Sequence, residues 1–200
     1  MPRPRSFDEQ TLLDCAQEVF WTRGYDRTSI EDVARASGVG NGSIYAAYGN
    51  KLGLFIAVFD RYCKGRVELV DHVIAGHTGT FESAVANFLD EIVGDCTSHS
   101  DLRGCLMLNS LAELGARFPE VMRIGRQSTS EMERIVRRRI AEAVDADELS
   151  LTVGEVEALG AHIVLVSQGL IQLSRLDTPV AQLRSIAATS ARMSSLLTAA

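Results

Sequence analysis

Aromatic residues, cysteines and long apolar runs are scarce in this chain. Its 200 residues include 6% aromatic side chains and four cysteines. The cysteines form no Cys-x-x-Cys pair and have no histidine at zinc-ligand spacing, so we expect neither a structural metal nor a disulfide framework, and no cofactor. No apolar run comes near the ~18 residues that cross a bilayer, and the first residues lead into charged sequence rather than the apolar core of a signal peptide. We therefore expect a cytoplasmic protein with no membrane contact.

An excess of positive charge is also missing. The formal net charge is −6. Residues 1–66 hold nine Lys/Arg and eight Asp/Glu, a balance of +1, whereas the remaining residues hold eleven and eighteen, a balance of −7. A chain that is acidic overall is not a general coat for nucleic acid. Any contact with nucleic acid is therefore expected in the first third.

Signals for β-strands are absent as well. Apolar residues recur at three- and four-residue steps, and no β-branched alternation is bounded by turn residues. Hydrophobic residues make up 46% and charged residues 23%, which are ordinary values for a globular protein. We predict an all-α fold with helices at about 7–22, 28–37, 41–48, 51 to the early seventies, 81–96, 103–116, 119–144, 153–175 and after Pro179.

The most informative stretch is TSIEDVARASGVGNGSIYAAYGNKLGLF, residues 28–55. Thr28 and Glu31 have the spacing of a capping box, which satisfies free amides at the start of a helix. A glycine-containing break then leads into a second short helix. A capped helix, a turn and a second helix at this spacing indicate a helix-turn-helix, whose second helix fits the major groove of DNA. The alternative is three packed helices in which Tyr45 and Tyr48 are core or boundary aromatics.

This stretch resembles the DNA-binding segment of the TetR family of bacterial regulators. There, Thr-x-Ile-x-x-Val-Ala-x-x-x-Gly-Val is followed by Gly-x-Ile/Leu-Tyr and Asn-Lys-x-x-Leu-Phe, as in this sequence. The resemblance covers about residues 7–66 in motif detail and is architectural beyond them. It implies an N-terminal three-helix helix-turn-helix domain, residues 1–50, and a C-terminal helical effector-binding and dimerisation domain, residues 51–200. Gly40-Asn41 and Ala46-Ala47 depart from the residues usual in relatives, so the operator sequence cannot be taken from them.

The resemblance and the chemistry of the side chains together assign roles at the predicted DNA surface. Hydroxyl and ammonium groups suit the phosphate backbone, and small or amide side chains suit base edges and thymine methyls. We expect Tyr45, Lys51 and Thr28 or Ser29 to contact phosphate, with Arg3 and Arg5 as a flexible arm. Base contacts are assigned to Asn41 and Ser43, with close approach at small neighbours. The full predicted set is Thr28, Ser29, Asn41, Gly42, Ser43, Tyr45, Ala46, Ala47, Tyr48 and Lys51.

Cys105 is the most distinctive residue of the C-terminal half. The stretch from Asp101 to Leu114 resembles a Gly-Cys-Leu…Asn…Glu stretch in one branch of the TetR family, which includes a repressor that senses electrophiles and oxidants through that cysteine. A helix beginning near Arg103 would put the thiol in its first turn beside a guanidinium, and both the helix dipole and the cation favour thiolate. The alternative is that Cys105 is a small buried hydrophobe.

A second route to regulation is a pocket for a small organic effector. Its expected lining is Phe55, Phe59, Tyr62, Phe88, Met107, Phe118 and Met122, each of which could equally be a core residue. The last two helices are the predicted homodimer face, against the alternative that they only complete the intramolecular core. Dimerisation would let two recognition helices read two half-sites of double-stranded operator DNA.

Motifs for catalysis are missing. The sequence has no phosphate-binding glycine loop, no Gly-x-Ser-x-Gly and no His-Glu-x-x-His. We therefore predict a dimeric DNA-binding transcriptional regulator rather than an enzyme. We expect a repressor that leaves its operator when a small molecule binds or when Cys105 is modified. The alternative for the C-terminal half is a DNA-binding protein that senses no effector.

Overall fold

The computed structural model describes residues 7–196, which leaves the predicted arm residues Arg3 and Arg5 outside the described range. Within that range all regular structure is helical, which confirms the predicted all-α fold. The elements are α1 (Glu9–Arg23), α2 (Ile30–Ser37), α3 (Asn41–Tyr48), α4 (Lys51–Val70), the π-helical segment η1 (Asp71–Ala75), α5 (Phe81–Thr97), α6 (Leu106–Leu114), α7 (Pro119–Asp145), α8 (Val153–Ser174) and α9 (Val180–Leu196).

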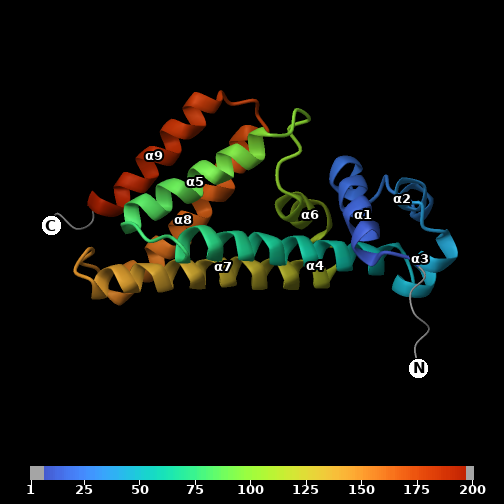
Figure 1. Cartoon of the computed structure of the whole chain (residues 1–200), viewed down its shortest axis with the longest axis horizontal. Coiled ribbons are helices and arrows are strands. Elements are labelled where there is room, and N and C mark those ends of the chain that lie inside the picture. The colour runs from blue at the N-terminus through green and yellow to red at the C-terminus, as the bar shows by residue number, and fades with distance from the viewer. Residues whose placement is uncertain (1–6, 197–200) are drawn as a thin grey trace.

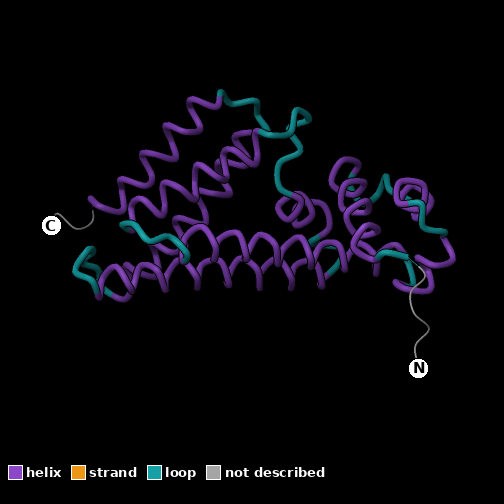
Figure 2. The backbone as a smooth tube through the Cα atoms, viewed as in Figure 1, coloured by secondary structure: helices purple, strands orange, loops and turns teal. Residues whose placement is uncertain are grey.

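The helices form two groups joined by one long helix (Figure 1). α1, α2 and α3 lie together at one end, and α4 runs from them along α7 into the larger group. At the other end α5 packs against both α8 and α9. α6 lies between the two groups and contacts α4 and α7. The loop between α5 and α6 extends towards α1 (Figure 2).

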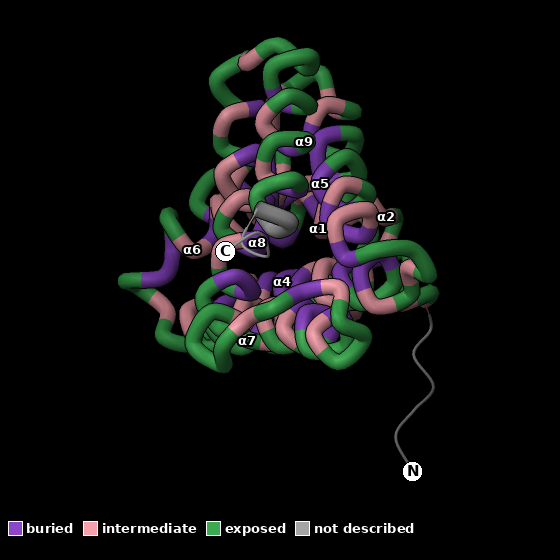
Figure 3. Tube along the Cα trace, turned by 90° about the vertical axis from the view of Figure 1, so that its left-hand side faces the viewer, coloured by how far each residue is buried: buried purple, intermediate pink, exposed green. Residues whose placement is uncertain are grey.

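The core runs through both groups without a break. On α4, Leu54, Phe55, Val58 and Phe59 recur at helical spacing and are fully buried. Phe55 meets the ring of Phe20 on α1 edge to face at 5.1 Å and stacks on Phe59 at 5.7 Å. Buried residues lie on the inward sides of the helices, and exposed residues lie on the outward turns (Figure 3). The shared core holds α1 against α4.

Two predicted helix starts are wrong in detail. The capping box of α2 is formed by Ser29 and Asp32, not by Thr28 and Glu31. Thr28 is unavailable because its hydroxyl donates to the Gly24 carbonyl inside the fold. α6 begins at Leu106 with Cys105 as its N-cap, because Leu102 and Gly104 have φ values of 50° and 66°, which no helix tolerates.

The expectation that no apolar segment reaches membrane-spanning length is wrong for α8. This helix of 22 residues contains a window of mean hydropathy 1.4, enough to cross a bilayer by length and composition alone. It packs against α5, α7 and α9, and core helices of soluble proteins pass the same test. The apolar character of α8 is therefore weak evidence for a membrane.

Candidate DNA-binding surface and effector region

α3 presents one side to solvent and one to the core. Gly38 ends α2 in the left-handed region at φ 72°, which a glycine adopts without strain, and the chain turns into α3 at once. Ile44 is fully buried, whereas Tyr45 beside it is 47% exposed. Gly40 is the N-cap of α3 and has no side-chain acceptor, so no capping side chain binds the first amides of α3. An uncapped helix start of this kind accepts a phosphate group.

The predicted DNA-binding residues fall into three classes of exposure. Gly42, Tyr45 and Ala46 are exposed. Thr28 is 2% exposed, and its hydroxyl donates inward, so it cannot reach a phosphate as it stands. The half-buried members are Ser29, Asn41, Ser43, Ala47, Tyr48 and Lys51.

Several of the half-buried groups are engaged within the protein. The Lys51 ammonium donates to the carbonyls of Tyr25 and Thr28, 2.9 Å away in each case. The Tyr48 hydroxyl donates to the Glu9 carboxylate at 2.9 Å. These three bonds fix α3 and α4 relative to α1 and its following loop. The side-chain oxygen of Asn41 is buried without a hydrogen-bond partner among the described residues.

Ion pairs join the DNA-binding helices to the rest of the molecule. Arg117, after α6, donates two hydrogen bonds to Asp26, with Nη–Oδ distances of 2.7 and 3.0 Å. These bonds hold the pKa of Asp26 below its ordinary range. Arg103 lies 2.7 Å from Glu18 on α1 and also binds Asp101. The loops at both ends of α6 are thus fastened to α1 and the loop that follows it.

Cys105 is buried, with 4% of its surface exposed, and the Tyr62 hydroxyl donates to its sulfur at 3.4 Å. Burial raises the pKa of Tyr62, so this hydroxyl stays protonated at neutral pH. The guanidinium that we expected beside the thiol binds the carboxylates of Glu18 and Asp101 instead. A cavity of about 20 Å³ adjoins Cys105 and is lined also by Arg66. That space holds about one water molecule.

The seven predicted effector-contact residues do not share one cavity. Phe88 and Met107 line the small space beside Cys105. Phe55 lines a different and larger cavity next to α1. The others lie elsewhere: Phe59 in the core, Tyr62 against Cys105, Phe118 against the Tyr25 ring, and Met122 in a surface groove beside Leu111.

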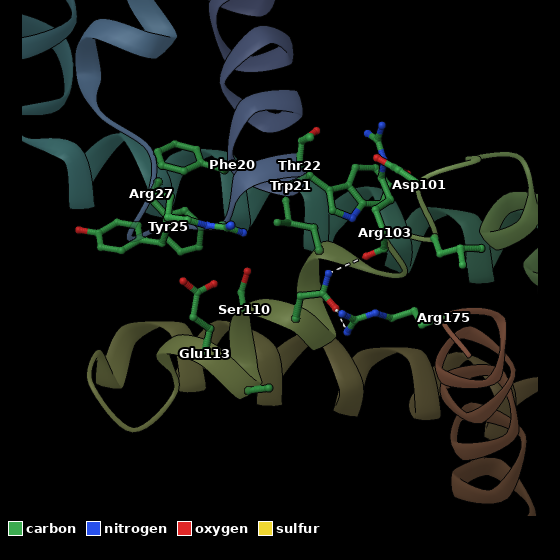
Figure 4. A pocket seen from close by; sticks show the side chains of 16 residues that line it. Phe20, Trp21, Thr22, Tyr25, Arg27, Asp101, Arg103, Ser110, Glu113 and Arg175 are labelled. Atoms are coloured by element: carbon green, nitrogen blue, oxygen red, sulfur yellow. Dashed lines mark hydrogen bonds and ion pairs between the residues drawn. The ribbon is translucent and has the colours of Figure 1, made fainter. Parts of the chain in front are cut away.

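The larger cavity measures about 610 Å³ and lies where α1, α6 and the end of α8 meet (Figure 4). We call it the joint cavity; its lining is Phe20, Trp21, Thr22, Gly24, Tyr25, Arg27, Phe55, Asp101, Leu102, Arg103, Leu106, Asn109, Ser110, Ala112, Glu113 and Arg175. Sequence reasoning missed it, because segments far apart in the chain meet there and no local pattern marks their meeting. In the described part of the chain, no group of three or more His, Cys, Asp or Glu side chains could hold a metal ion.

Exposed apolar side chains gather on the C-terminal helices. Of the large hydrophobic residues that are exposed within the described range, all except Tyr45 lie on α8, on α9 or between them; they are Val153, Leu165, Leu176, Val180 and Met193. α8 carries no Asp, Glu, Lys or Arg from Ala158 to Gln172. Such an uncharged, partly apolar face is typical of a surface that is covered by another protein.

Two family descriptions match the chain. Residues 12–58 match bacterial regulatory proteins of the tetR family, and residues 83–189 match the tetracyclin repressor-like C-terminal domain. Together these matches span the helix-turn-helix and most of the helical remainder.

Proteins with similar sequences or structures are transcriptional regulators. The HTH-type transcriptional repressor ComR of Escherichia coli (strain K12) is 28% identical over 96% of this chain and 90% of its own length. The solved structure of a cysteine mutant of the TetR family transcriptional regulator CifR, complexed with 26-bp operator DNA, is 29% identical with a TM-score of 0.77, covering 95% of this chain and 98% of that one. Reduced E. coli NemR has a TM-score of 0.81, over 90% of this chain and 93% of its own, but is 13% identical and shows only the shared fold.

Proposed function

The chain belongs to the TetR family of DNA-binding bacterial regulators, and we propose that it is a dimeric repressor that reads a two-half-site operator with α3. The observation that carries this proposal is the outward face of α3, with Tyr45 exposed and the first amides uncapped, at the recognition position of a helix-turn-helix. Repression is supported by the name of the relative ComR. A regulator of this family acts on DNA in the cytoplasm and is not an enzyme.

The proposed DNA contacts follow from exposure. Tyr45 and the first amides of α3 contact phosphates, because they combine donors with access to solvent. The hydroxyl of Ser29 already donates to Asp32 within the capping box, so Ser29 supports the start of α2 beside this surface. Asn41 and Ser43 are assigned to base edges by their place at the start of α3, and the buried, unpartnered Oδ1 atom of Asn41 would turn outward to reach a base. The small side chains of Gly42, Ala46 and Ala47 permit close approach. The polar groups of Thr28, Tyr48 and Lys51 form hydrogen bonds within the protein. These residues therefore support the DNA-binding surface and do not contact DNA directly.

The boundary between the two domains is proposed to lie at the start of α4. Residues 1–50 form the DNA-binding domain, and residues 51–200 form the effector-binding and dimerisation domain. α4 begins at Lys51 against the DNA-binding helices and ends within the larger group, so it connects the two.

The dimer is proposed to form through α8 and α9. The exposed apolar residues and the charge-free stretch of α8 support this choice over α7, whose outward side carries many charges. A two-fold pair joined there would present two α3 helices to successive half-sites.

Release from DNA is proposed to start near α6, by a bound small molecule or by modification of Cys105. A substituent on the thiol would not fit in about 20 Å³, so it would push α6 away from α4. α6 also carries Glu113, whose carboxylate lies against Gly24 and the Asp26 amide. Movement of α6 would therefore disturb the attachment of α1.

The test is operator binding, measured by gel shift on DNA from upstream of the protein's own gene. Wild type should bind specifically and lose the DNA after treatment with an alkylating electrophile, whereas Cys105→Ser should bind and keep it. Cys15→Ser is the matched control and should behave as wild type. Burial raises the pKa of Cys63 to about 12, so that thiol should stay unmodified at neutral pH.

Each result separates the alternatives. Absence of specific binding would refute the repressor proposal. If the electrophile leaves wild type on DNA, Cys105 has a packing role and a small molecule remains the effector. If neither cell extracts of small metabolites nor electrophiles change binding, the protein is a DNA-binding protein without an effector.

A further inference from the structure

One face of α8 carries a regular stripe of uncharged residues. They follow one another at alternating steps of four and three residues, and they are Gly154, Ala158, Ala161, Leu165, Gln168 and Gln172. All six are exposed except Gln168, which is half-buried. Steps that average ~3.5 residues keep side chains on one narrow face of a helix, which is the pattern with which two helices pack along each other.

α8 leaves much of its apolar surface outside the fold. Only 39% of its 18-residue apolar window is buried inside the protein. Four members of the stripe also line a surface hollow of about 410 Å³ against α7; they are Ala158, Ala161, Leu165 and Gln168. The stripe therefore offers both the apolar surface and the room that another helix needs.

The stripe is small at one end and large at the other. Its first half holds glycine and alanine, and its second half holds leucine and glutamine. An added Cβ at Gly154 would meet no atom within 4 Å, so the space over the small end is open. Two copies of α8 that cross antiparallel at Ile163 would place every large residue of the stripe against a small one. The facing pairs would be Leu165 with Ala161, Gln168 with Ala158 and Gln172 with Gly154.

The charges at the ends of α8 favour the same orientation. Glu155 and Glu157 lie near its start, and Arg175 is its C-cap. An antiparallel pair brings the acidic start of each helix towards the basic end of the other. A parallel pair would bring like charges together at both ends, and it would set small residues against small ones and leave gaps.

We propose that a second copy of the chain covers this stripe, with the two α8 helices antiparallel about a two-fold axis at Ile163. This inference rests on the proposed dimer and specifies its register. Leu165 and Gln168 of each copy enter the hollow beside α7 of the other. Both copies then use the same patch, as a closed two-fold dimer requires. The register sets the separation of the two α3 helices, and with it the spacing of the half-sites that the dimer reads.

Disulfide formation tests the register, because two cysteines are bridged only when their Cα atoms come within about 7 Å. The variants are made in full-length Cys15→Ser protein, whose other three cysteines are buried. Ala158→Cys/Gln168→Cys should form a reducible crosslinked dimer on mild oxidation, read on a non-reducing gel. Its crosslinked fraction should exceed that of either single variant at least ~10-fold.

The single variants stay apart for a geometric reason. In the proposed register the two copies of Ala158, or of Gln168, lie ten residues apart along the paired helices, which is ~15 Å. The two positions within one chain are separated by the same distance, so they cannot be bridged either. Efficient crosslinking of Ala158→Cys alone would mean that the helices are parallel, and it would overturn the proposal.

Ala158→Cys/Gln172→Cys is the matched control, because it lies four residues, or ~6 Å, out of the proposed register. It should crosslink no more than the single variants. If it crosslinked in place of Ala158→Cys/Gln168→Cys, the helices would pair in another register and the proposal would be wrong. Circular dichroism melting establishes that each variant is folded.

Sedimentation and operator binding separate this inference from the proposed function. A dimer in which Ala158→Cys/Gln168→Cys fails to crosslink keeps the dimeric repressor and refutes the register. A monomer refutes the dimer and its register, whereas specific operator binding still identifies a DNA-binding regulator. The oxidised double variant should bind operator as tightly as its reduced form, because the disulfides join residues that already face each other. Loss of operator binding in the oxidised form alone would show that the DNA-bound dimer has a different register.

Discussion

The Nζ atom of Lys51 lies 2.9 Å from the carbonyl oxygens of both Tyr25 and Thr28, and 4.2 Å from the centre of the Tyr25 ring. Lys51 is the first residue of α4, whereas the two carbonyls belong to the loop between α1 and α2. One ammonium group therefore fastens the start of the connecting helix to the DNA-binding helices. It donates to both carbonyls of this loop, of which that of Tyr25 also accepts from the Thr28 amide.

Lys51→Gln should lower the free energy of unfolding by about 2 kcal/mol, because two charge-assisted hydrogen bonds and a cation–π contact are lost. Urea unfolding measures this loss. The dependence of operator affinity on salt should keep its slope, since the ammonium is engaged inside the protein. A slope smaller by about 1 would instead mean that Lys51 neutralises a phosphate, as the sequence alone led us to expect.

Tyr45→Phe removes the hydroxyl from the exposed face of α3. Operator affinity should fall about 10-fold, while the free energy of unfolding should change by no more than ~0.5 kcal/mol. Fluorescence anisotropy with labelled operator measures the first quantity and thermal melting the second. Tyr48→Phe is the matched control: it loses the bond to Glu9, so its main effect should be on melting. If the two variants bind DNA equally well, Tyr45 has no direct contact.

Ser29→Ala should destabilise the protein by about 1 kcal/mol, because α2 loses its N-cap and half of its capping box. Glu31→Gln, which alters the partner expected from sequence, should leave stability unchanged. The comparison is made by chemical denaturation at neutral pH. If Glu31→Gln lost more stability than Ser29→Ala, the capping box would be formed by Thr28 and Glu31, as the sequence led us to expect.

The carboxyl of Asp26 should titrate below the ordinary aspartate value of about 3.9, because Arg117 hydrogen-bonds its charged form. A pKa lowered by folding stabilises the protein above the unfolded value, and this contribution is lost as the pH falls through the folded value. Arg117→Gln should therefore raise the pKa of Asp26, and its stability should converge with that of wild type in acid. Carboxyl NMR titration measures the shift.

Arg123→Gln is the control for that titration, because Arg123 pairs with Glu120 and not with Asp26. It should leave the Asp26 titration where it is in wild type. An unshifted Asp26 in Arg117→Gln would mean that the ion pair is absent in solution.

Leu165→Arg should split the proposed dimer into monomers, because it places a charge in the apolar face of α8 where 64% of the leucine surface is exposed. Analytical ultracentrifugation gives the mass directly. Gln127→Arg, an exposed change on α7, should keep the mass of wild type. Operator affinity should fall with the dimer. A dimeric Leu165→Arg protein would place the interface elsewhere.

The helices themselves were largely predictable from the sequence. α3 has the predicted bounds, and α5, α7 and α8 differ from prediction by one residue or less at each end, since long amphipathic or apolar runs with clear breaks determine them. The capping box was misplaced because Thr28–Glu31 and Ser29–Asp32 have the same spacing. Only packing, which buries the Thr28 hydroxyl, decides between the two pairs.

The sites were less predictable than the helices. The motif predicted the position of α3 correctly, but it did not indicate that Lys51 and Tyr48 form hydrogen bonds within the protein. Their partners, Tyr25 and Glu9, lie 26 and 39 residues away in the chain. The predicted start of α6 was wrong because Leu102 has a φ of 50°, a conformation that a leucine rarely adopts and that its residue type therefore does not indicate. The wall of the joint cavity includes Arg175 and Asn109, which are hydrogen-bonded although they lie 66 residues apart in the chain.

α4 has 20 residues, so at ~1.5 Å per residue it is a rod about 30 Å long. Its far end continues into η1, and π-helical turns are places where helices change direction. A rotation of about 5° there would carry the start of α4 through roughly 2.6 Å, approaching the ~3.4 Å between successive bases on a DNA strand. A small rotation at η1 would therefore displace the DNA-binding helices at the other end of α4 by almost the spacing between neighbouring bases of the operator.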